Sequence, residues 1–144
     1  MKNHFLIGLF VCLFISCSRN EELTNNGEYY ALIKMSGSIA GSETTGEDME
    51  WQETICLYSN NTFTKIRFTE DEKIEAFGSY SKKIIESEEF VELVYDIDNS
   101  LIANYTGNLI EHLIVLDDYS LQGTWSYCDG PVLEYSKAIL CGTI

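Results

Sequence analysis

Side-chain polarity alternates with a period of two residues along most of the chain after residue 27. Successive side chains of a β-strand point to opposite faces, so this period predicts strands with one apolar and one polar face. The alternating segments are 28–36, 49–58, 62–69, 73–81, 89–96, 109–116, 119–128 and 132–138. Turn-forming pairs such as Asn60-Asn61 and Gly130-Pro131 separate most of them. No long amphipathic helix is predicted, and residues 82–89 fit either one helical turn or a loop.

Eight short strands at close spacing predict an all-β domain, in which the strands form either an antiparallel barrel or a β-sandwich. The period of two cannot separate a sheet that closes on itself from two sheets that stack. Residues 28–144 are long enough for one such domain with a single apolar core.

The segment from Trp51 to Phe68 is typical of a hairpin, in which Asn60-Asn61 forms a two-residue loop and tolerates positive φ angles. This loop places Ile55 opposite Ile66 and gives the hairpin one apolar and one polar face. The apolar face collects Trp51, Ile55, Leu57, Ile66 and Phe68, and the polar face includes Cys56. A loop longer by one residue would mix Glu53, Lys65 and Arg67 with the apolar side chains, so we expect the short loop.

Aromatic side chains are the candidates for the inside of the predicted barrel. In the strand 121–128, Leu121, Gly123, Trp125 and Tyr127 share one face. We expect Trp51, Tyr80, Trp125 and Tyr127 to point inward, where they either fill the core or line a cavity. An eight-stranded barrel has room for either arrangement.

Two strings of residues resemble small bacterial lipocalin-like domains. The first is Leu57-Tyr58-Ser59-Asn60-Asn61-Thr62-Phe63-Thr64, and the second is Ala76-Phe77-Gly78-Ser79-Tyr80. Gly123-Thr124-Trp125 falls in a late strand, as in similar lipoproteins, and Gly27-Glu28-Tyr29 stands where true lipocalins have Gly-x-Trp. The resemblance covers residues 27–137. It implies an up-and-down barrel of about eight strands with room for a ligand cavity, and it implies no catalytic residues.

An apolar run of eleven residues, Phe5–Ile15, follows Lys2 near the start of the sequence. A membrane-spanning helix needs about 20 apolar residues, so this run is too short to cross a bilayer. A positive residue, a short apolar run and small residues after it are typical of a secretory signal peptide.

The end of this run, Leu13-Phe14-Ile15-Ser16-Cys17, resembles a bacterial lipobox, although Ile15 stands where the family prefers a small residue. The resemblance implies cleavage before Cys17 and acyl chains such as palmitate on Cys17, which would anchor the protein to the outer membrane of the cell envelope. Residues 1–16 would be the signal peptide, 17–27 the lipidated Cys and a flexible tether, and 28–144 the barrel domain. The acidic stretch after Cys17 resembles a tag for display on the cell surface. The alternative is an ordinary secretory signal with a chance Cys.

The formal net charge of −14 limits the partners of the protein. Such a surface repels phosphates, so no binding of nucleic acid is expected. We expect a binding protein of the cell envelope that holds a small apolar or aromatic ligand. The alternative is a protein-interaction or inhibitor role, in which loops such as residues 36–46 bind a basic partner.

The sequence indicates no catalytic or metal site. His112 is the one histidine after the signal, and nothing in the sequence places a Ser or Cys nucleophile against it. Residues 96–100 begin like a calcium loop, but Leu101 and Gly107 occupy the positions where an EF-hand needs Gly and Glu. We therefore expect neither an enzyme nor a cofactor.

Three cysteines follow Cys17, and an exported protein meets oxidising conditions in which a disulfide is stable. Their connectivity does not follow from the sequence. We prefer a Cys128–Cys141 disulfide, because the expected hairpin register leaves Cys56 on the outer face. No CxxC spacing indicates zinc.

Overall fold

The computed structural model describes residues 27–104, 106–128 and 130–138, with the backbone alone at positions 127 and 128. Strands and two short 3₁₀ helices, η1 and η2, form most of this part of the chain. In chain order the elements are β1 (Gly27–Ser36), β2 (Thr44–Thr45), η1 (Gly46–Asp48), β3 (Gln52–Tyr58), β4 (Thr62–Phe68), β5 (Lys73–Ile85), β6 (Glu88–Tyr95), β7 (Ile110–Asp117), β8 (Ser120–Gly123), η2 (Trp125–Cys128) and β9 (Val132–Ala138).

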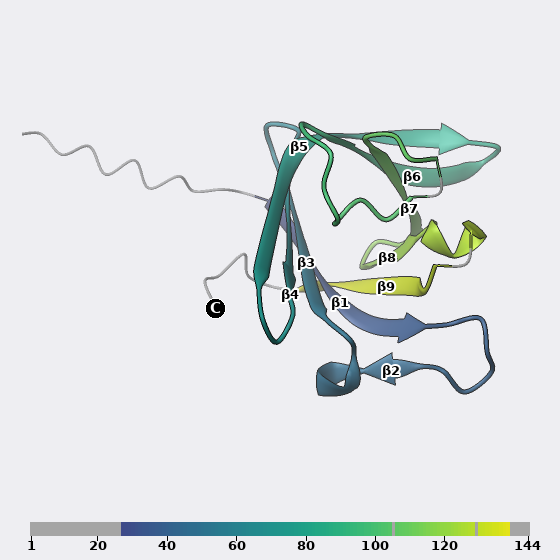
Figure 1. Ribbon diagram of the computed structural model, residues 1–144. Coiled ribbons are helices and arrows are strands. Elements are labelled where there is room, and N and C mark those ends of the chain that lie inside the picture. The colour runs from purple at the N-terminus through teal and green to yellow at the C-terminus, as the bar shows by residue number, and fades with distance from the viewer. Residues whose placement is uncertain (1–26, 105, 129, 139–144) are drawn as a thin grey trace, which may run out of the picture.

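The strands form one antiparallel sheet that closes on itself (Figure 1). From β3 to β9 each strand pairs with the next one in sequence, and β1 pairs with both β3 and β9. These eight strands make an up-and-down barrel, and the short β2 is added beside the end of β1. The predicted all-β barrel is therefore confirmed, and the β-sandwich alternative is wrong.

The path of the chain distinguishes the two ends of the barrel. At the mouth end, β1 and β8 end while β3 and β9 begin. At the opposite end, β1 begins beside the last residues of β9, because Tyr29 pairs with Ala138. We call this the tether end, because the expected tether would precede β1. The first and the last described residues therefore lie at the same end of the barrel, away from its mouth (Figure 1).

The β3–β4 hairpin has a register that differs from the expected one. Ile55 pairs with Lys65 and Glu53 pairs with Arg67, so the loop has three residues, 59–61, the last at a positive φ of 63°. The expected two-residue loop is wrong, because it assumed that charged side chains must share the outer face. Glu53, Lys65 and Arg67 are instead inside the barrel, with exposed fractions of 1%, 0% and 8%. Charged groups can occupy the inner face here because they pair with one another.

The β5–β6 hairpin is longer than the sequence suggested. Residues 82–89 are neither a helical turn nor a loop, because β5 continues to Ile85 and β6 begins at Glu88. The two residues between them, Glu86 and Ser87, have positive φ angles of 51° and 75°. Positive φ at both central positions is the requirement of a type I′ turn, which matches the twist of the two strands.

The expected strand 119–128 is correct only over its first half. β8 ends at Gly123, and the chain then turns into η2, which carries Trp125 away from the sheet. A Cβ atom at Gly130 would come within 2.5 Å of Trp125 Cγ. The absence of a side chain at Gly130 therefore lets the indole of Trp125 pack directly against the backbone.

Apolar side chains from every barrel strand meet in one core. Its largest fully buried members are Tyr135, Phe63, Ile55, Leu57, Leu93, Leu113, Leu121 and Leu133. Each such side chain contributes about 1.5–3 kcal/mol when it leaves water. Leu101 and Ala103, between β6 and β7, are buried with this core, and Figure 1 shows their segment crossing the middle of the barrel.

Candidate ligand pocket at the barrel mouth

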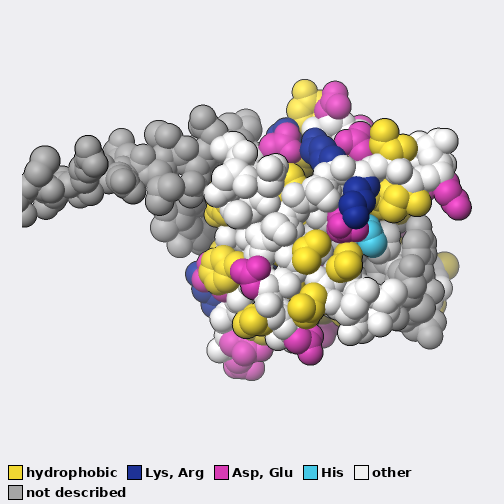
Figure 2. Space-filling view, turned by 90° about the horizontal axis from the view of Figure 1, so that it is seen from above, with side chains coloured by type: hydrophobic (Ala, Val, Ile, Leu, Met, Phe, Trp, Pro, Cys, Tyr) yellow, Lys and Arg dark blue, Asp and Glu magenta, His cyan; other side chains and the backbone are white. Residues whose placement is uncertain are grey.

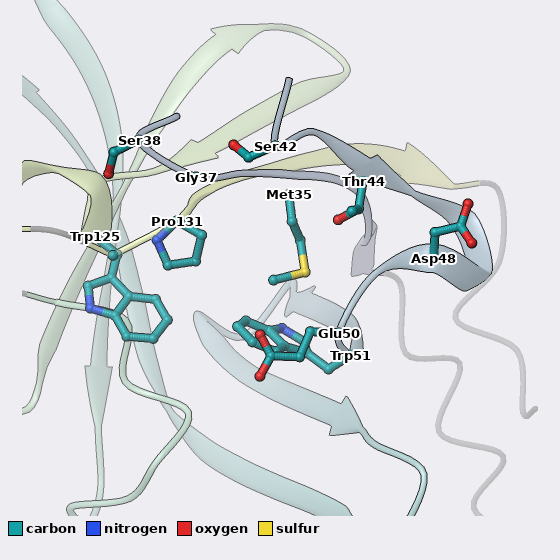
Figure 3. Close-up of a pocket in the computed structure, with 11 residues that line it drawn as sticks. Met35, Gly37, Ser38, Ser42, Thr44, Asp48, Glu50, Trp51, Trp125 and Pro131 are labelled. Atoms are coloured by element: carbon teal, nitrogen blue, oxygen red, sulfur yellow. The ribbon is translucent and has the colours of Figure 1, made fainter. Parts of the chain in front are cut away.

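A cavity of about 590 Å³ opens at the mouth end of the barrel. Its volume lies in the range of small-molecule sites, about 300–1,000 Å³. We call it the mouth pocket, and its walls come from the end of β1 and the loop after it, from β2 and η1, from the two residues just before β3, and from η2 and the residues after it. The apolar part of the wall is formed by Met35, Trp51, Trp125 and Pro131 (Figure 3). The polar part carries the carboxylates of Asp48 and Glu50 and the hydroxyls of Ser38, Ser42 and Thr44.

Met35 and Trp51 form one side of the mouth pocket. Both are largely buried, with exposed fractions of 6% and 9%, and Figure 3 shows the thioether of Met35 pointing from β1 toward the Trp51 ring. Below this wall, the guanidinium carbon of Arg67 lies 4.3 Å from the centre of the Trp51 ring, a cation–π contact. The buried indole N–H of Trp51 donates to no described residue.

The segment between β1 and β3 is held in place by several hydrogen bonds. Ser42 donates from its backbone N–H and from its hydroxyl to the carbonyl of Ile39, at 3.1 and 2.6 Å. The Gln52 side chain donates to the carbonyl of Gly46 at 2.7 Å, and β2 pairs with β1. This loop, which the sequence offered as a site for a basic partner, is therefore an ordered wall of the mouth pocket.

A network of charged and phenolic groups lies inside the barrel beneath the mouth pocket. We call it the ionic core, and it consists of Glu53, Lys65, Arg67, Tyr95, Glu111 and Tyr135. The Lys65 Nζ lies 2.9 Å from both carboxylate oxygens of Glu111 and 3.1 Å from Glu53 Oε1. It also donates to the carbonyl of Leu101 at 3.1 Å. One ammonium group therefore joins β3, β7 and the segment that crosses the barrel.

Glu53 is the second junction of the ionic core. Its Oε2 accepts a hydrogen bond from Arg67 Nε at 2.7 Å, and Arg67 Nη2 lies equally close without the alignment of a hydrogen bond. Its Oε1 accepts a hydrogen bond from the Tyr135 hydroxyl at 2.6 Å. Burial raises the pKa of Glu53, but Lys65 and Arg67 together outweigh it and hold this pKa below the ordinary value of 4.5.

The two tyrosines of the ionic core are held protonated. Burial raises the pKa of Tyr95 well above 10, and the Glu111 carboxylate, which accepts its hydroxyl hydrogen bond, raises it further. Burial likewise raises the pKa of Tyr135, and the neighbouring Glu53 adds to the effect. The ionic core therefore contains two cations, two anions and two neutral donors, and it is closed to solvent. Its groups join neighbouring strands of the barrel from the inside.

The predicted cavity residues fall in different places. Trp51 and Trp125 come together in the mouth pocket. Tyr80 lies elsewhere, on β5, where its hydroxyl donates to the carbonyl of Tyr58 at 3.1 Å and its ring lines a separate hollow that includes Gly27 and Glu28. The side chain of Tyr127 lies outside the described part of the structure.

The predicted lipidation and disulfide residues are not tested by the structure. Cys17, Cys141 and the side chain of Cys128 lie outside the described residues. Cys56 lies on the face of β3 opposite the inward Ile55 and Leu57, as expected, but it is covered there, with an exposed fraction of 8%. The Cys128–Cys141 disulfide stays a prediction.

His112 lies on the outer face of β7. Its Nε2 is 3.1 Å from Glu92 Oε2, and Lys83 Nζ is 2.6 Å from the other oxygen of that carboxylate. Figure 2 shows the imidazole beside basic and acidic side chains on this face. His112 thus belongs to a surface ion-pair cluster on neighbouring strands. Among the described residues, no group of three His, Cys, Asp or Glu side chains is placed to hold a metal ion.

Comparison with known proteins adds no relative. No protein-family model matches the chain, and no significant match was found among the curated proteins or the solved structures. The described residues include no helix with the length and apolar character needed to cross a membrane.

Proposed function

We propose that this protein is a lipid-anchored binding protein of the bacterial cell envelope, and that it holds a small apolar or aromatic ligand in the mouth pocket. The observation that carries this proposal is the convergence of Trp51 and Trp125 on one cavity of about 590 Å³. Ligand sites combine such aromatic walls with a few polar groups that orient the ligand. The hydroxyls of Ser38, Ser42 and Thr44 supply such groups.

The position of the pocket fits a tethered protein. Cys17 would carry the lipid, and β1 begins at Gly27, so nine residues form the tether. A chain of this length reaches at most about 35 Å. Because β1 begins at the tether end, the mouth pocket would face away from the membrane and meet ligands from the surrounding medium. Display on the outer surface and an orientation into the periplasm both satisfy this geometry.

Native mass spectrometry of the full chain, purified in detergent from its own host, tests the binding function. We expect a reproducible small bound molecule that is lost on unfolding and in a Trp51→Ala/Trp125→Ala variant. Tyr119→Ala is the matched control, because Tyr119 is exposed in the turn between β7 and β8, at the tether end. A bound mass that persists without both indoles would place the ligand elsewhere and contradict the proposal.

The lipid anchor has its own test. Growth with an alkyne-labelled fatty acid should label the native chain but not a Cys17→Ser variant. Ser16→Ala is the control, because it keeps a small residue before the cleavage site and should keep the label. Equal labelling of the Cys17→Ser variant would rule out Cys17 as the anchor.

A second candidate function is the capture of a basic protein. It is favoured by the ordered loop between β1 and β3, which presents Glu43, Glu47, Asp48 and Glu50 on the surface of a chain with net charge −14. Such a surface attracts basic partners, and the attraction weakens as salt is added. A pull-down at low salt, repeated with Glu43, Glu47 and Glu50 all changed to Gln, tests this candidate. Equal capture by the variant would exclude this loop.

A further inference from the structure

The charged side chains that line the mouth pocket all carry the same sign. Its described lining includes the carboxylates of Asp48 and Glu50 and no Lys or Arg. None of the ion pairs between described residues involves either carboxylate. Below the pocket, the Arg67 guanidinium lies against the Trp51 ring and is already paired with Glu53. The pocket therefore presents two uncompensated negative charges to whatever enters it.

The aromatic walls favour the same kind of ligand. The electron-rich face of an indole attracts cations more strongly than any other aromatic side chain. Trp51 already makes one such contact with Arg67, whereas the contacts between described residues place no cation on the Trp125 ring. Trp125 thus shares the pocket with two carboxylates, and the face of its ring holds no cation among the described residues.

Trp51 offers its ring, and not its N–H, to an occupant of the pocket. The residue is nine-tenths buried and lines the cavity. Its indole N–H is enclosed and has no acceptor among the described residues, so it would not donate to a ligand held in the pocket.

From these observations we infer that the mouth pocket selects small organic cations, in which an aromatic or apolar body carries a positively charged amine. This inference rests on the proposed function and adds the charge of the ligand to it. The body would pack against Trp51, Trp125, Met35 and Pro131, and the ammonium group would lie near Glu50, which Figure 3 shows beside Trp51, while Asp48 adds negative charge farther along the wall. Anionic ligands such as fatty acids would be rejected by these carboxylates and by the net charge of −14.

Three probes that share a phenylethyl body and differ in charge test this inference: phenethylamine, 2-phenylethanol and 3-phenylpropanoate. The chain has two tryptophans, Trp51 and Trp125, and both line the mouth pocket, so tryptophan fluorescence reports on this site directly. The full chain in detergent is titrated at low salt, and an empty-micelle titration is subtracted. We expect the amine to bind about tenfold more tightly than the alcohol, and the acid to bind most weakly.

The variants separate charge from packing. Asp48→Asn/Glu50→Gln should bind the amine and the alcohol with equal affinity, while its affinity for the alcohol stays that of the native chain. Glu47→Gln is the matched control, because Glu47 lies in η1 next to Asp48 but outside the pocket lining, and it should keep the preference. Addition of salt should reduce the preference for the amine.

Different results would contradict the inference about ligand charge and the proposed small-molecule pocket. If the alcohol or the acid binds as tightly as the amine, the inference about charge is overturned and the proposed pocket stands. If none of the three probes changes the fluorescence up to its solubility limit, the inference is overturned together with the proposed small-molecule pocket.

Discussion

The guanidinium of Arg67 lies against the ring of Trp51, with 4.3 Å between the guanidinium carbon and the ring centre. This contact joins the mouth pocket to the ionic core. Above it, Trp51 is a wall of the mouth pocket, and below it, Arg67 pairs with Glu53 in the ionic core. The loops that form the candidate pocket are thereby supported by charged groups buried inside the barrel.

Loss of the Lys65 ammonium should destabilise the barrel strongly. Lys65→Met keeps the length and apolar stem of the side chain but leaves Glu111 with no cation partner in a buried site. Removal of one partner from a buried ion pair costs about 3–5 kcal/mol. Urea unfolding of the native chain and of the variant measures the difference.

Lys83→Met is the control for this substitution. Lys83 pairs with Glu92 on the outer face, and its side chain is 46% exposed. An exposed pair contributes about 0–1 kcal/mol, so the control should unfold almost as the native chain does. Similar losses in the two variants would show that burial of the network does not determine its energy.

The stability of the barrel should fall in acid because of Glu53. Its folded pKa lies below the ordinary value of 4.5, so its ion pairs contribute fully above about pH 4.5 and are lost as the pH falls through the folded value. The free energy of unfolding, measured in urea from about pH 7 to about pH 3, should decrease over this window. Exposed pairs are screened by salt and this buried site is not, so the decrease should persist in about 1 M NaCl. A decrease that salt abolishes would assign the effect to surface groups.

The buried tyrosines should resist ionisation in alkali. Burial and nearby carboxylates raise the pKa of Tyr95 and of Tyr135 above 10, and burial raises that of Tyr30 to about 12. Because the unfolded chain releases these protons near pH 10, stability should fall as the pH rises above that value. Ultraviolet absorbance of phenolate should show part of the nine tyrosines ionising only when circular dichroism shows unfolding. Ionisation of all nine in one early step would contradict the protonated core.

Gly130→Ala should alter the mouth pocket through Trp125. The new Cβ would lie 2.5 Å from Trp125 Cγ, a distance at which the indole must move. We expect a changed tryptophan emission spectrum and weaker binding of phenethylamine. Gly123→Ala is the control, because its Cβ would meet Leu133 at an ordinary 3.5 Å. Unchanged emission in Gly130→Ala would show that this glycine does not position the indole.

The barrel was predictable because its determinants are local. Alternation along each strand and turn residues between strands depend on neighbours in sequence, and they gave the all-β fold and the approximate limits of the barrel strands. Closure of the sheet depends on the pairing of β1 with β9, about a hundred residues apart, and period two carries no information on it. The resemblance to lipocalin-like domains supplied that step.

The ionic core was missed because the rule of one apolar and one polar face excluded it. That rule rejected the correct register, in which Glu53, Lys65 and Arg67 share a face with Ile55 and Leu57. A usable signal was present, since Glu111 shares a face with Leu113 on another apolar strand and could supply the second anion. Opposite charges on the apolar faces of several strands indicate a buried network, but only their three-dimensional pairing shows that the charges balance.

Two residues that line the candidate pocket, Trp51 and Trp125, were predicted from the sequence. The inward period of two identified Trp51 and Trp125 but also Tyr80, which lies on another part of the barrel. Asp48 and Glu50 were not predicted, because loop residues reach the pocket through β2 and η1, and neither element has a clear signature in sequence.

The closure of the barrel has a consequence for the proposed lipid-anchored form of the protein, which would be held at high density on a surface. Strand edges recruit copies of the same chain, and tethering raises the local concentration at which such recruitment begins. Here β1 and β9 pair through their backbone hydrogen-bonding groups. The extra strand beside β1, β2, has only two residues, Thr44 and Thr45. Neighbouring molecules crowded side by side would thus find little backbone to pair with, so dense display need not lead to aggregation.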